Sequence, residues 1–292
     1  MTIEELTRII RAAGGRENAM AYADALLEKI DRVEASGRFA GLLSQFCTAR
    51  EAGDFRGRVL EVNFAELFVR KGHDLIYGAR QGMTGDIDFR WNVAGREMFI
   101  EMKLLGQHRN TKAEINRQLE RTSLGAMHID NDLPDVVRLQ RDIIQKATTR
   151  KFHPNPSATA LNIVAVDVSE LQLGTVDIAD CLLAAGGNAV VSRYFDAAYC
   201  REGIVGVFES IPDTAGTEQN RWVAEVHKVS GGEPHPRQYI HAAMFLFRKP
   251  RETAALSYKL ASVIVWNAAL VRADVARAVE LALHEVLPRE VA

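Results

Sequence analysis

Two neighbouring segments, 86–93 and 98–105, alternate between two kinds of side chain. In the first segment the apolar face consists of Ile87, Phe89, Trp91 and Val93, and the polar face consists of Asp86, Asp88, Arg90 and Asn92. In the second segment one face consists of Met98, Ile100, Met102 and Leu104, and the other of Phe99, Glu101, Lys103 and Leu105. A period of two residues is typical of a half-buried β-strand. The residues between the segments, which include Ala94 and Gly95, are turn-like, so the pattern predicts a β-hairpin.

Helical patterns precede this hairpin. Residues 19–33 are rich in good helix formers, a second helix is expected over 38–50, and Gly53 is expected to break the helical pattern. A further helix is expected over 56–71, because apolar side chains recur there at helical spacing, at Leu60, Phe64, Leu67 and Phe68. Gly72 follows this helix in the position where glycine commonly ends one.

The pattern of the whole chain predicts an α/β protein with three segments. These are an N-terminal helical segment over 1–52, a core over 53–170 and a C-terminal α/β extension over 171–292 that packs on the core or continues it. The segment 161–168 is a near-continuous apolar run, which is typical of a strand buried on both faces. The further expected strands are 75–77, 204–208 and 239–247, and the further expected helices are 135–149, 178–185 and 273–286.

Composition and charge exclude several classes of protein. The chain has 292 residues, of which 47% are hydrophobic and 25% charged, an ordinary globular mixture. The formal net charge of −2 excludes a polycation that coats nucleic acid, so any nucleic-acid site must be a local patch. Three cysteines without a Cys-x-x-Cys pair favour a reducing compartment and argue against a zinc knuckle. The N-terminal residues lack the features of a signal peptide, and the longest apolar stretches are too short to span a bilayer, so we expect a cytoplasmic protein without membrane contact.

The hairpin carries the residues of greatest chemical interest. If its turn is centred on Ala94 and Gly95, Asp88 lies directly opposite Glu101, with Cβ atoms about 4.5–5.5 Å apart. Two opposed carboxylates repel unless a cation lies between them, and Mg²⁺ typically takes one or two carboxylates together with waters and phosphate. Lys103 follows on the same face as Glu101, where its ammonium would lie beside the metal and an incoming phosphate or water. The alternative interpretation of this pattern is a solvated strand face.

The preceding helix adds a further acid. Glu61 and Glu66 lie roughly 140° apart around that helix, so they do not share a face. Glu66 has Arg70 at the i+4 position, which predicts a surface ion pair. Glu61 borders the apolar stripe, where a carboxylate needs a partner, and a metal ion or a metal-bound water would provide one.

These residues together resemble a known family. The chain contains, in order, GRVLE ending at Glu61, Gly72 at the helix end, GDID ending at Asp88, and FIEMK ending at Lys103. This series resembles the PD-(D/E)xK nuclease superfamily, and locally its Holliday-resolvase-like and YraN-type members. The resemblance covers about residues 56–105, with weaker support as far as Val168. It implies a restriction-endonuclease-like fold, a mixed sheet flanked by helices with an αβββαβ core, within residues 53–170.

The resemblance also implies roles for individual residues. Asp88 and Glu101 would ligate Mg²⁺, for which Mn²⁺ can substitute, with the Met102 carbonyl as a third protein ligand. Lys103 would orient or activate the attacking water and stabilise the transition state. Glu61 would bind a second metal or position a water.

The chain departs from the family pattern at one position. The usual proline before the aspartate is absent, and Ile87 stands in its place. Asp86 is therefore a rival to Asp88 for the aspartate role, although Asp88 is preferred.

Basic residues that follow the hairpin, as far as Lys151, are candidates for phosphate contacts, chiefly Arg109, Lys112, Arg117, Arg138, Arg141 and Lys146. The alternative is that these residues form a solvated helix face. Lys146 lies on the helix after the Glu-x-Lys segment, where some relatives place a residue near the site.

The sequence thus predicts a Mg²⁺-dependent nuclease, a DNA endonuclease of restriction or defence type, with DNA favoured over RNA. A homodimer is expected by analogy, because cutting two strands often uses two copies. The alternatives are a structure-selective resolvase or repair nuclease, a non-catalytic nucleic-acid-binding or scaffold protein that retains the fold, and a structural α/β domain.

Overall fold

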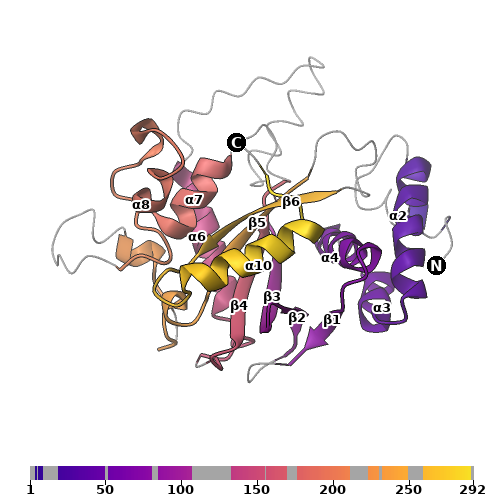
Figure 1. Cartoon of the computed structure of the whole chain (residues 1–292). Helices are drawn as coiled ribbons and strands as arrows, with labels where there is room; N and C mark the ends of the chain where they lie inside the picture. The colour runs from indigo at the N-terminus through magenta and orange to yellow at the C-terminus, as the bar shows by residue number, and fades with distance from the viewer. Residues whose placement is uncertain are drawn as a thin grey trace, which may run out of the picture.

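A six-stranded mixed sheet runs through the molecule, with its strands in sequential order (Figure 1). The strands are β1 (Leu75–Ala79), β2 (Ile87–Val93), β3 (Arg96–Leu104), β4 (Ala160–Asp167), β5 (Ala242–Arg248) and β6 (Leu260–Trp266). The pairs β1–β2, β2–β3 and β5–β6 are antiparallel, whereas β3–β4 and β4–β5 are parallel. A mixed sheet flanked by helices confirms the predicted α/β class.

The computed structural model describes residues 4, 6–8, 19–49, 52–80, 85–106, 133–154, 156–169, 176–210, 223–229, 232–248 and 259–290. Its main helices are α2 (Ala19–Ala35), α3 (Ala40–Thr48), α4 (Ala52–Arg70), α6 (Leu133–Ala147), α7 (Ile178–Gly186), α8 (Asn188–Val191) and α10 (Ala273–Val286). Two short 3₁₀ helices are η2 (Ala197–Tyr199) and η3 (Pro236–Gln238). Within the described part of the chain, no helix has both the length and the apolar character needed to cross a bilayer.

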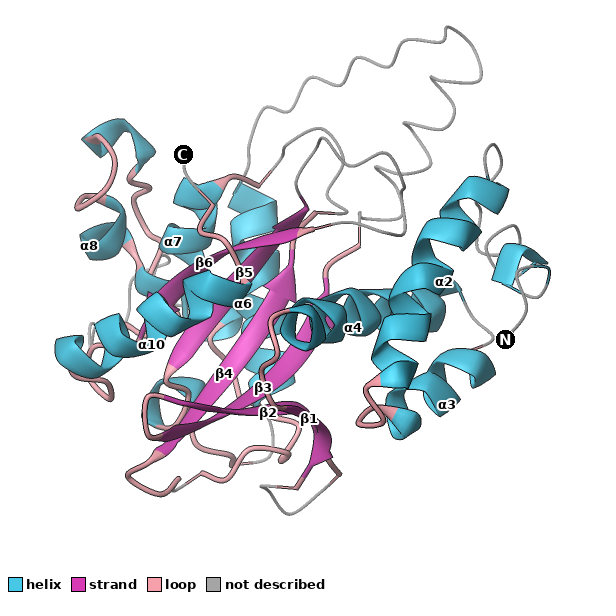
Figure 2. Ribbon diagram, turned by 45° about the vertical axis from the view of Figure 1, so that its right-hand side comes forward, coloured by secondary structure: helices cyan, strands magenta, loops and turns pink. Residues whose placement is uncertain are grey.

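Helices cover both faces of the sheet, so the fold has three layers. Figure 2 shows α4 and α10 on the near face of the sheet and α6 and α7 behind it. On the α4 face, Phe68 and Leu283 belong to the same buried core as Ile100 of β3. On the α6 face, Ile143 packs in a second core that includes Val164 of β4. All eight residues of β4 are buried because both faces are covered, as its apolar run predicted.

The β2–β3 hairpin has the predicted register. Val93 pairs with Arg96, and Phe89 pairs with Ile100. The two turn residues between the strands both have positive φ, 48° at Ala94 and 71° at Gly95. Positive φ at both central positions defines a type I′ turn, whose twist matches that of the flanking strands. The turn therefore fixes which residues of β2 and β3 face one another.

Helix α4 ends as its glycine predicted. Gly72 has a φ of 72°, and the His73 amide donates to the Phe68 carbonyl at 3.0 Å. This is the Schellman arrangement, which satisfies carbonyls at the end of the helix. The start of the helix was predicted wrongly, because α4 begins at Ala52 and includes Gly53. Glycine in a helix costs only about 1 kcal/mol relative to alanine, so the packing of α4 outweighs it.

Two further differences concern the strands. The expected strand at 204–208 does not form. Instead, the amides of Val207 and Phe208 donate to the carbonyls of Ala184 and Ala185, at the end of α7. Strand β6 was not predicted, and it pairs with β5 at the edge of the sheet. Since β5 pairs with β4, strands from the segment 171–292 continue the sheet of the segment 53–170.

Candidate active site

The backbone pairing between β2 and β3 gives way to side-chain contacts at Asp88 and Glu101. Beyond the pair Phe89 and Ile100, the Asp88 amide donates to Glu101 Oε2 at 3.2 Å. The Met102 amide donates to Asp88 Oδ2 at 2.7 Å. The two carboxylates thus take over hydrogen bonds that neighbouring strands usually make through their backbones. The structure brings together the two residues that the hairpin register placed opposite one another.

Both carboxylates are removed from solvent. The Glu101 side chain is fully buried, and the Asp88 side chain is 12% exposed. Burial and, after it, the charge of Glu101 raise the pKa of Asp88 above its ordinary value. Burial and a neighbouring negative charge both disfavour the ionised form of Asp88. A positive charge beside the two carboxylates would therefore stabilise the site.

Two lysines, one on α6 and one in the turn after it, place positive charge beside these carboxylates. Lys146 Nζ lies 2.8 Å from Glu101 Oε1, and Lys151 Nζ lies 2.5 Å from the same oxygen. Lys151 Nζ is also 3.9 Å from Asp88 Oδ1. Burial alone would lower the pKa of Lys151, but the hydrogen bond to Glu101 and the charges of both acids outweigh burial and raise it. The sequence predicted Lys146 and Lys151 as candidates for phosphate contacts within the basic residues after the hairpin, and did not predict that either would contact Glu101.

Lys103 lies elsewhere. Its Nζ is 3.3 Å from Asp142 Oδ1 on α6, and among the described residues it forms no ion pair with Asp88 or Glu101. Lys103 lies two residues after Glu101 and on the same face of β3. Since α6 runs across that face, Asp142 is the acid that Lys103 meets there. The described ion pair of Lys103 is thus with Asp142, whereas those of Glu101 are with Lys146 and Lys151.

Glu61 approaches the site from α4. Its side chain is 9% exposed, and Arg58 donates to both of its carboxylate oxygens, at 2.8 and 2.7 Å. The hydroxyl of Tyr77 lies 3.2 Å from Glu61 Oε2. Burial and, after it, the charge of Asp88 raise the pKa of Glu61 to about 7, although Arg58 opposes this shift. Glu61 therefore lies close enough to Asp88 for the two charges to interact.

Glu66 is not the surface residue that the sequence predicted. It is 1% exposed, and it pairs with Arg32 of α2. Helix α2 packs along this side of α4, where Lys29 Nζ also donates to Asn63 Oδ1 at 2.7 Å. The i+4 spacing to Arg70 is a local signal, and the contact between α2 and α4 overrides it.

The rival aspartate and the third predicted ligand have different surroundings. The Asp86 side chain is 50% exposed, and Arg80 Nε lies 3.2 Å from it. Asp86 therefore lies outside the buried group, which leaves Asp88 as the acid of this strand. Met102 contacts Asp88 through its backbone amide, and its side chain packs in the core on the α4 face.

The predicted basic residues do not form one surface in the described structure. Arg109, Lys112 and Arg117 lie outside the described residues. Arg138 donates to the Gly106 carbonyl at 2.5 Å, and its Nη1 is buried without a partner among the described residues. Arg141 is exposed to solvent. Lys146 contacts Glu101 and Arg138 contacts Gly106, so Arg141 is the residue of this predicted set that the structure describes as exposed and available for a phosphate.

The donor set of the site suits a hard cation. Within the described ranges, no three acidic, histidine or cysteine side chains converge closely enough to hold a metal ion. Mg²⁺, however, is usually bound by one or two carboxylates, with waters and substrate phosphate as its other ligands. Asp88 and Glu101 fit that pattern, provided that the ammonium groups beside Glu101 make room.

Neither a family model, nor a curated protein, nor a solved structure matches the chain.

Proposed function

We propose that the protein is a Mg²⁺-dependent nuclease of the PD-(D/E)xK type that acts on DNA. The observation that carries the proposal is the buried pair of Asp88 on β2 and Glu101 on β3, with Glu61 of α4 near enough for the charge of Asp88 to raise its pKa. The order α4–β1–β2–β3–α6–β4 supports a restriction-endonuclease-like core, because it has the αβββαβ sequence of elements. The antiparallel β1–β2–β3 meander and the parallel β3–β4 pair, joined across α6, give the same support.

Asp88 and Glu101 would hold the Mg²⁺ ion. When bound, the ion would neutralise phosphate charge and lower the pKa of a bound water. Glu61, fixed by Arg58 and Tyr77, would orient the attacking water through its carboxylate. In the hydrolysis the water oxygen bonds to phosphorus and the water gives up one proton, while the bond from phosphorus to the leaving sugar oxygen breaks and that oxygen takes up one proton.

The test compares Asp88→Asn with Asp86→Asn on supercoiled plasmid, linear duplex, single-stranded DNA and RNA, with Mg²⁺ or with chelator. We expect Mg²⁺-dependent cleavage of DNA by the wild-type protein. Asp88→Asn should reduce it at least about 10²-fold, the scale of losing one group that stabilises the transition state. Asp86→Asn should stay within a few-fold, because its side chain is half-exposed and pairs with Arg80 outside the buried group. Cleavage that does not need Mg²⁺, or that survives Asp88→Asn, would contradict the proposal.

A second candidate is a non-catalytic DNA-binding or scaffold protein. The contacts of Lys146 and Lys151 with Glu101 favour it, since they balance the buried charge without a metal. A scaffold protein would show no Mg²⁺-dependent rise in melting temperature, whereas the nuclease should show one that Asp88→Asn abolishes.

A further inference from the structure

Lys151 reaches both carboxylates of the candidate site. Its Nζ lies 2.5 Å from Glu101 Oε1 and 3.9 Å from Asp88 Oδ1. Its aliphatic chain runs beside Gly85, where a Cβ atom would lie 3.8 Å from Lys151 Cε. The Lys151 side chain is 26% exposed, so part of it is open to solvent. A phosphate that binds beside the two carboxylates would meet this ammonium.

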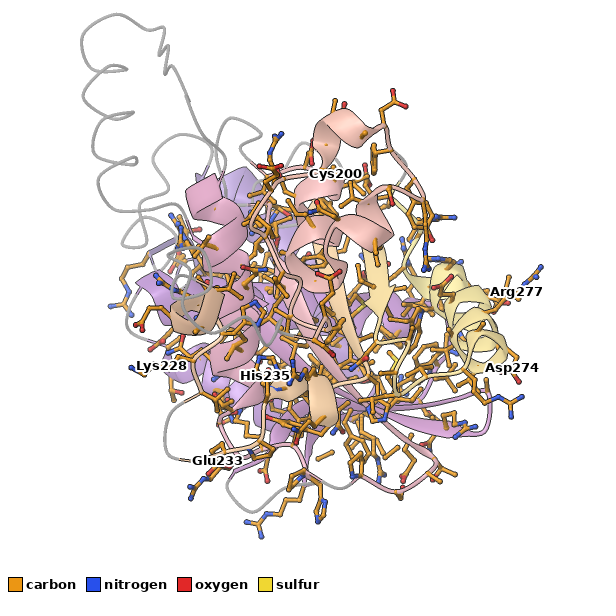
Figure 3. All side chains as sticks on the ribbon, turned by 90° about the vertical axis from the view of Figure 1, so that its left-hand side faces the viewer. Cys200, Lys228, Glu233, His235, Asp274 and Arg277 are labelled. Carbon is orange, nitrogen blue, oxygen red and sulfur yellow. The ribbon has the colours of Figure 1, made fainter. Side chains whose placement is uncertain are left out.

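The turn before Lys151 has an unusual conformation. Helix α6 ends at Ala147, and Arg150 adopts a positive φ of 61°. A residue other than glycine pays roughly 1–2 kcal/mol in this left-handed region. Arg150 Nε donates to Glu233 Oε1 at 2.6 Å, which anchors the strained residue to a distant part of the chain (Glu233 is labelled in Figure 3). Strain that the surroundings hold in place is a feature of functional sites, and here it directly precedes Lys151.

Lys103 has a structural partner instead. Its ammonium pairs with Asp142, an acid of α6 whose side chain is only 15% exposed. The pair joins β3 to the helix that covers it. Lys103 would have to leave Asp142 before it could reach a phosphate at Asp88 and Glu101.

We infer that Lys151, and not Lys103, is the lysine that stabilises the scissile phosphate. This inference rests on the proposed nuclease function. Lys151 supplies a positive charge beside the bond that breaks, where negative charge develops on the phosphate oxygens. Lys146 contacts Glu101 from α6 and holds that carboxylate in position. Lys103 and Asp142 brace α6 against the sheet.

The experiment measures two properties in each variant: the rate of plasmid cleavage with Mg²⁺, and the affinity for Mn²⁺ by electron paramagnetic resonance. Lys151→Met should lower the rate by about 10²–10³-fold, the loss expected for one group that stabilises transition-state charge. Its Mn²⁺ affinity should stay equal or rise a few-fold, because an ammonium that competes for Glu101 Oε1 has been removed. Lys151→Arg, which restores the charge, should recover part of the rate. Lys228→Met is the matched control, since the Lys228 side chain is 67% exposed and its Nζ lies 3.9 Å from Glu225 (Lys228 is labelled in Figure 3).

Lys103 is tested against its own partner. If the pair is a brace, Lys103→Met and Asp142→Asn should lower the rate and the melting temperature by similar amounts. If Lys103 is the catalytic lysine, Lys103→Met should lower the rate far more than Asp142→Asn, and that result would overturn the inference. It would also be overturned by wild-type cleavage in Lys151→Met, or by a loss of Mn²⁺ binding together with cleavage, which would mean that Lys151 only shapes the carboxylates. Absence of cleavage by the wild-type protein would refute the nuclease proposal first, and the inference with it.

Discussion

The ion pair between Arg32 of α2 and Glu66 of α4 has one buried end and one half-exposed end. The Glu66 side chain is 2% exposed, whereas the Arg32 side chain is 45% exposed. Removal of either partner breaks the same contact, but the partner that remains is in a different position. After loss of Glu66, Arg32 can return to water. After loss of Arg32, Glu66 remains as a carboxylate inside the protein.

This asymmetry sets the expected magnitudes. Arg32→Met should lower the free energy of unfolding by about 3 kcal/mol, at the lower end of the 3–5 kcal/mol found when a buried pair loses one partner. Glu66→Gln should lower it by about 1.5 kcal/mol, because a charge-assisted hydrogen bond is weakened but no charge is stranded. The same helix carries Glu61, so the pair also anchors the helix that delivers a site residue.

The assay is urea unfolding followed by circular dichroism, for both single variants and the double variant. The pair of Arg38 with Asp74 is the matched control, with an N–O distance of 2.9 Å and an Asp74 side chain that is 94% exposed. Asp74→Asn should change the free energy of unfolding by less than about 1 kcal/mol, as is usual for surface pairs. The reasoning is refuted if Arg32→Met costs less than Glu66→Gln, or if both cost no more than Asp74→Asn.

Three further predictions concern other parts of the molecule. Burial lowers the pKa of His241 to about 4, and its Nδ1 accepts from the Asn162 amide at 2.9 Å. As the pH falls, the imidazole of His241 binds a proton in the unfolded chain at a higher pH than in the folded protein. The free energy of unfolding should therefore fall by about 3 kcal/mol between about pH 6.5 and pH 4. Urea melts of His241→Gln should lack that loss. Gly206→Ala should destabilise by about 1–3 kcal/mol in urea melts, because its Cβ would collide with backbone atoms, whereas Gly57→Ala, with open space in α4, should stabilise by about 0.5–1 kcal/mol. Arg141→Gln should reduce the salt dependence of duplex binding by one phosphate contact, a log–log slope of roughly 0.9, and an unchanged slope would leave Arg141 as a solvated residue.

The hairpin was predictable because its information is local. Alternation identified both strands, and the turn residues Ala94 and Gly95 fixed the register that places Asp88 opposite Glu101. The end of α4 was predictable for the same reason, since Gly72 is a local signal. The apolar run of β4 predicted a strand with both faces covered.

The errors occurred where a distant segment decides the environment. Glu66 has a plausible partner four residues away, but α2 covers it and supplies Arg32 instead. The segment 204–208 has the apolar character of a strand, yet its amides bind the end of α7, which leaves no room for a strand ladder there. Strand β6 lies in an apolar stretch without clear alternation, and only its pairing with β5 defines it.

Which lysines lie beside the two acids of the candidate site also depends on a distant segment. A Glu-x-Lys segment places its lysine on the same face as the glutamate, but a shared face does not guarantee a shared site when a helix crosses it. Here α6 carries Asp142 for Lys103 and Lys146 for Glu101, since its turns run antiparallel to β3. Lys151 lies fifty residues after Glu101 in the sequence. The residue before it, Arg150, has a left-handed backbone conformation, but because it is not a glycine the sequence gives no sign of a turn there. Sequence reasoning can locate the two acids from one hairpin, but the cation that serves them depends on how the crossover helix lies on the sheet.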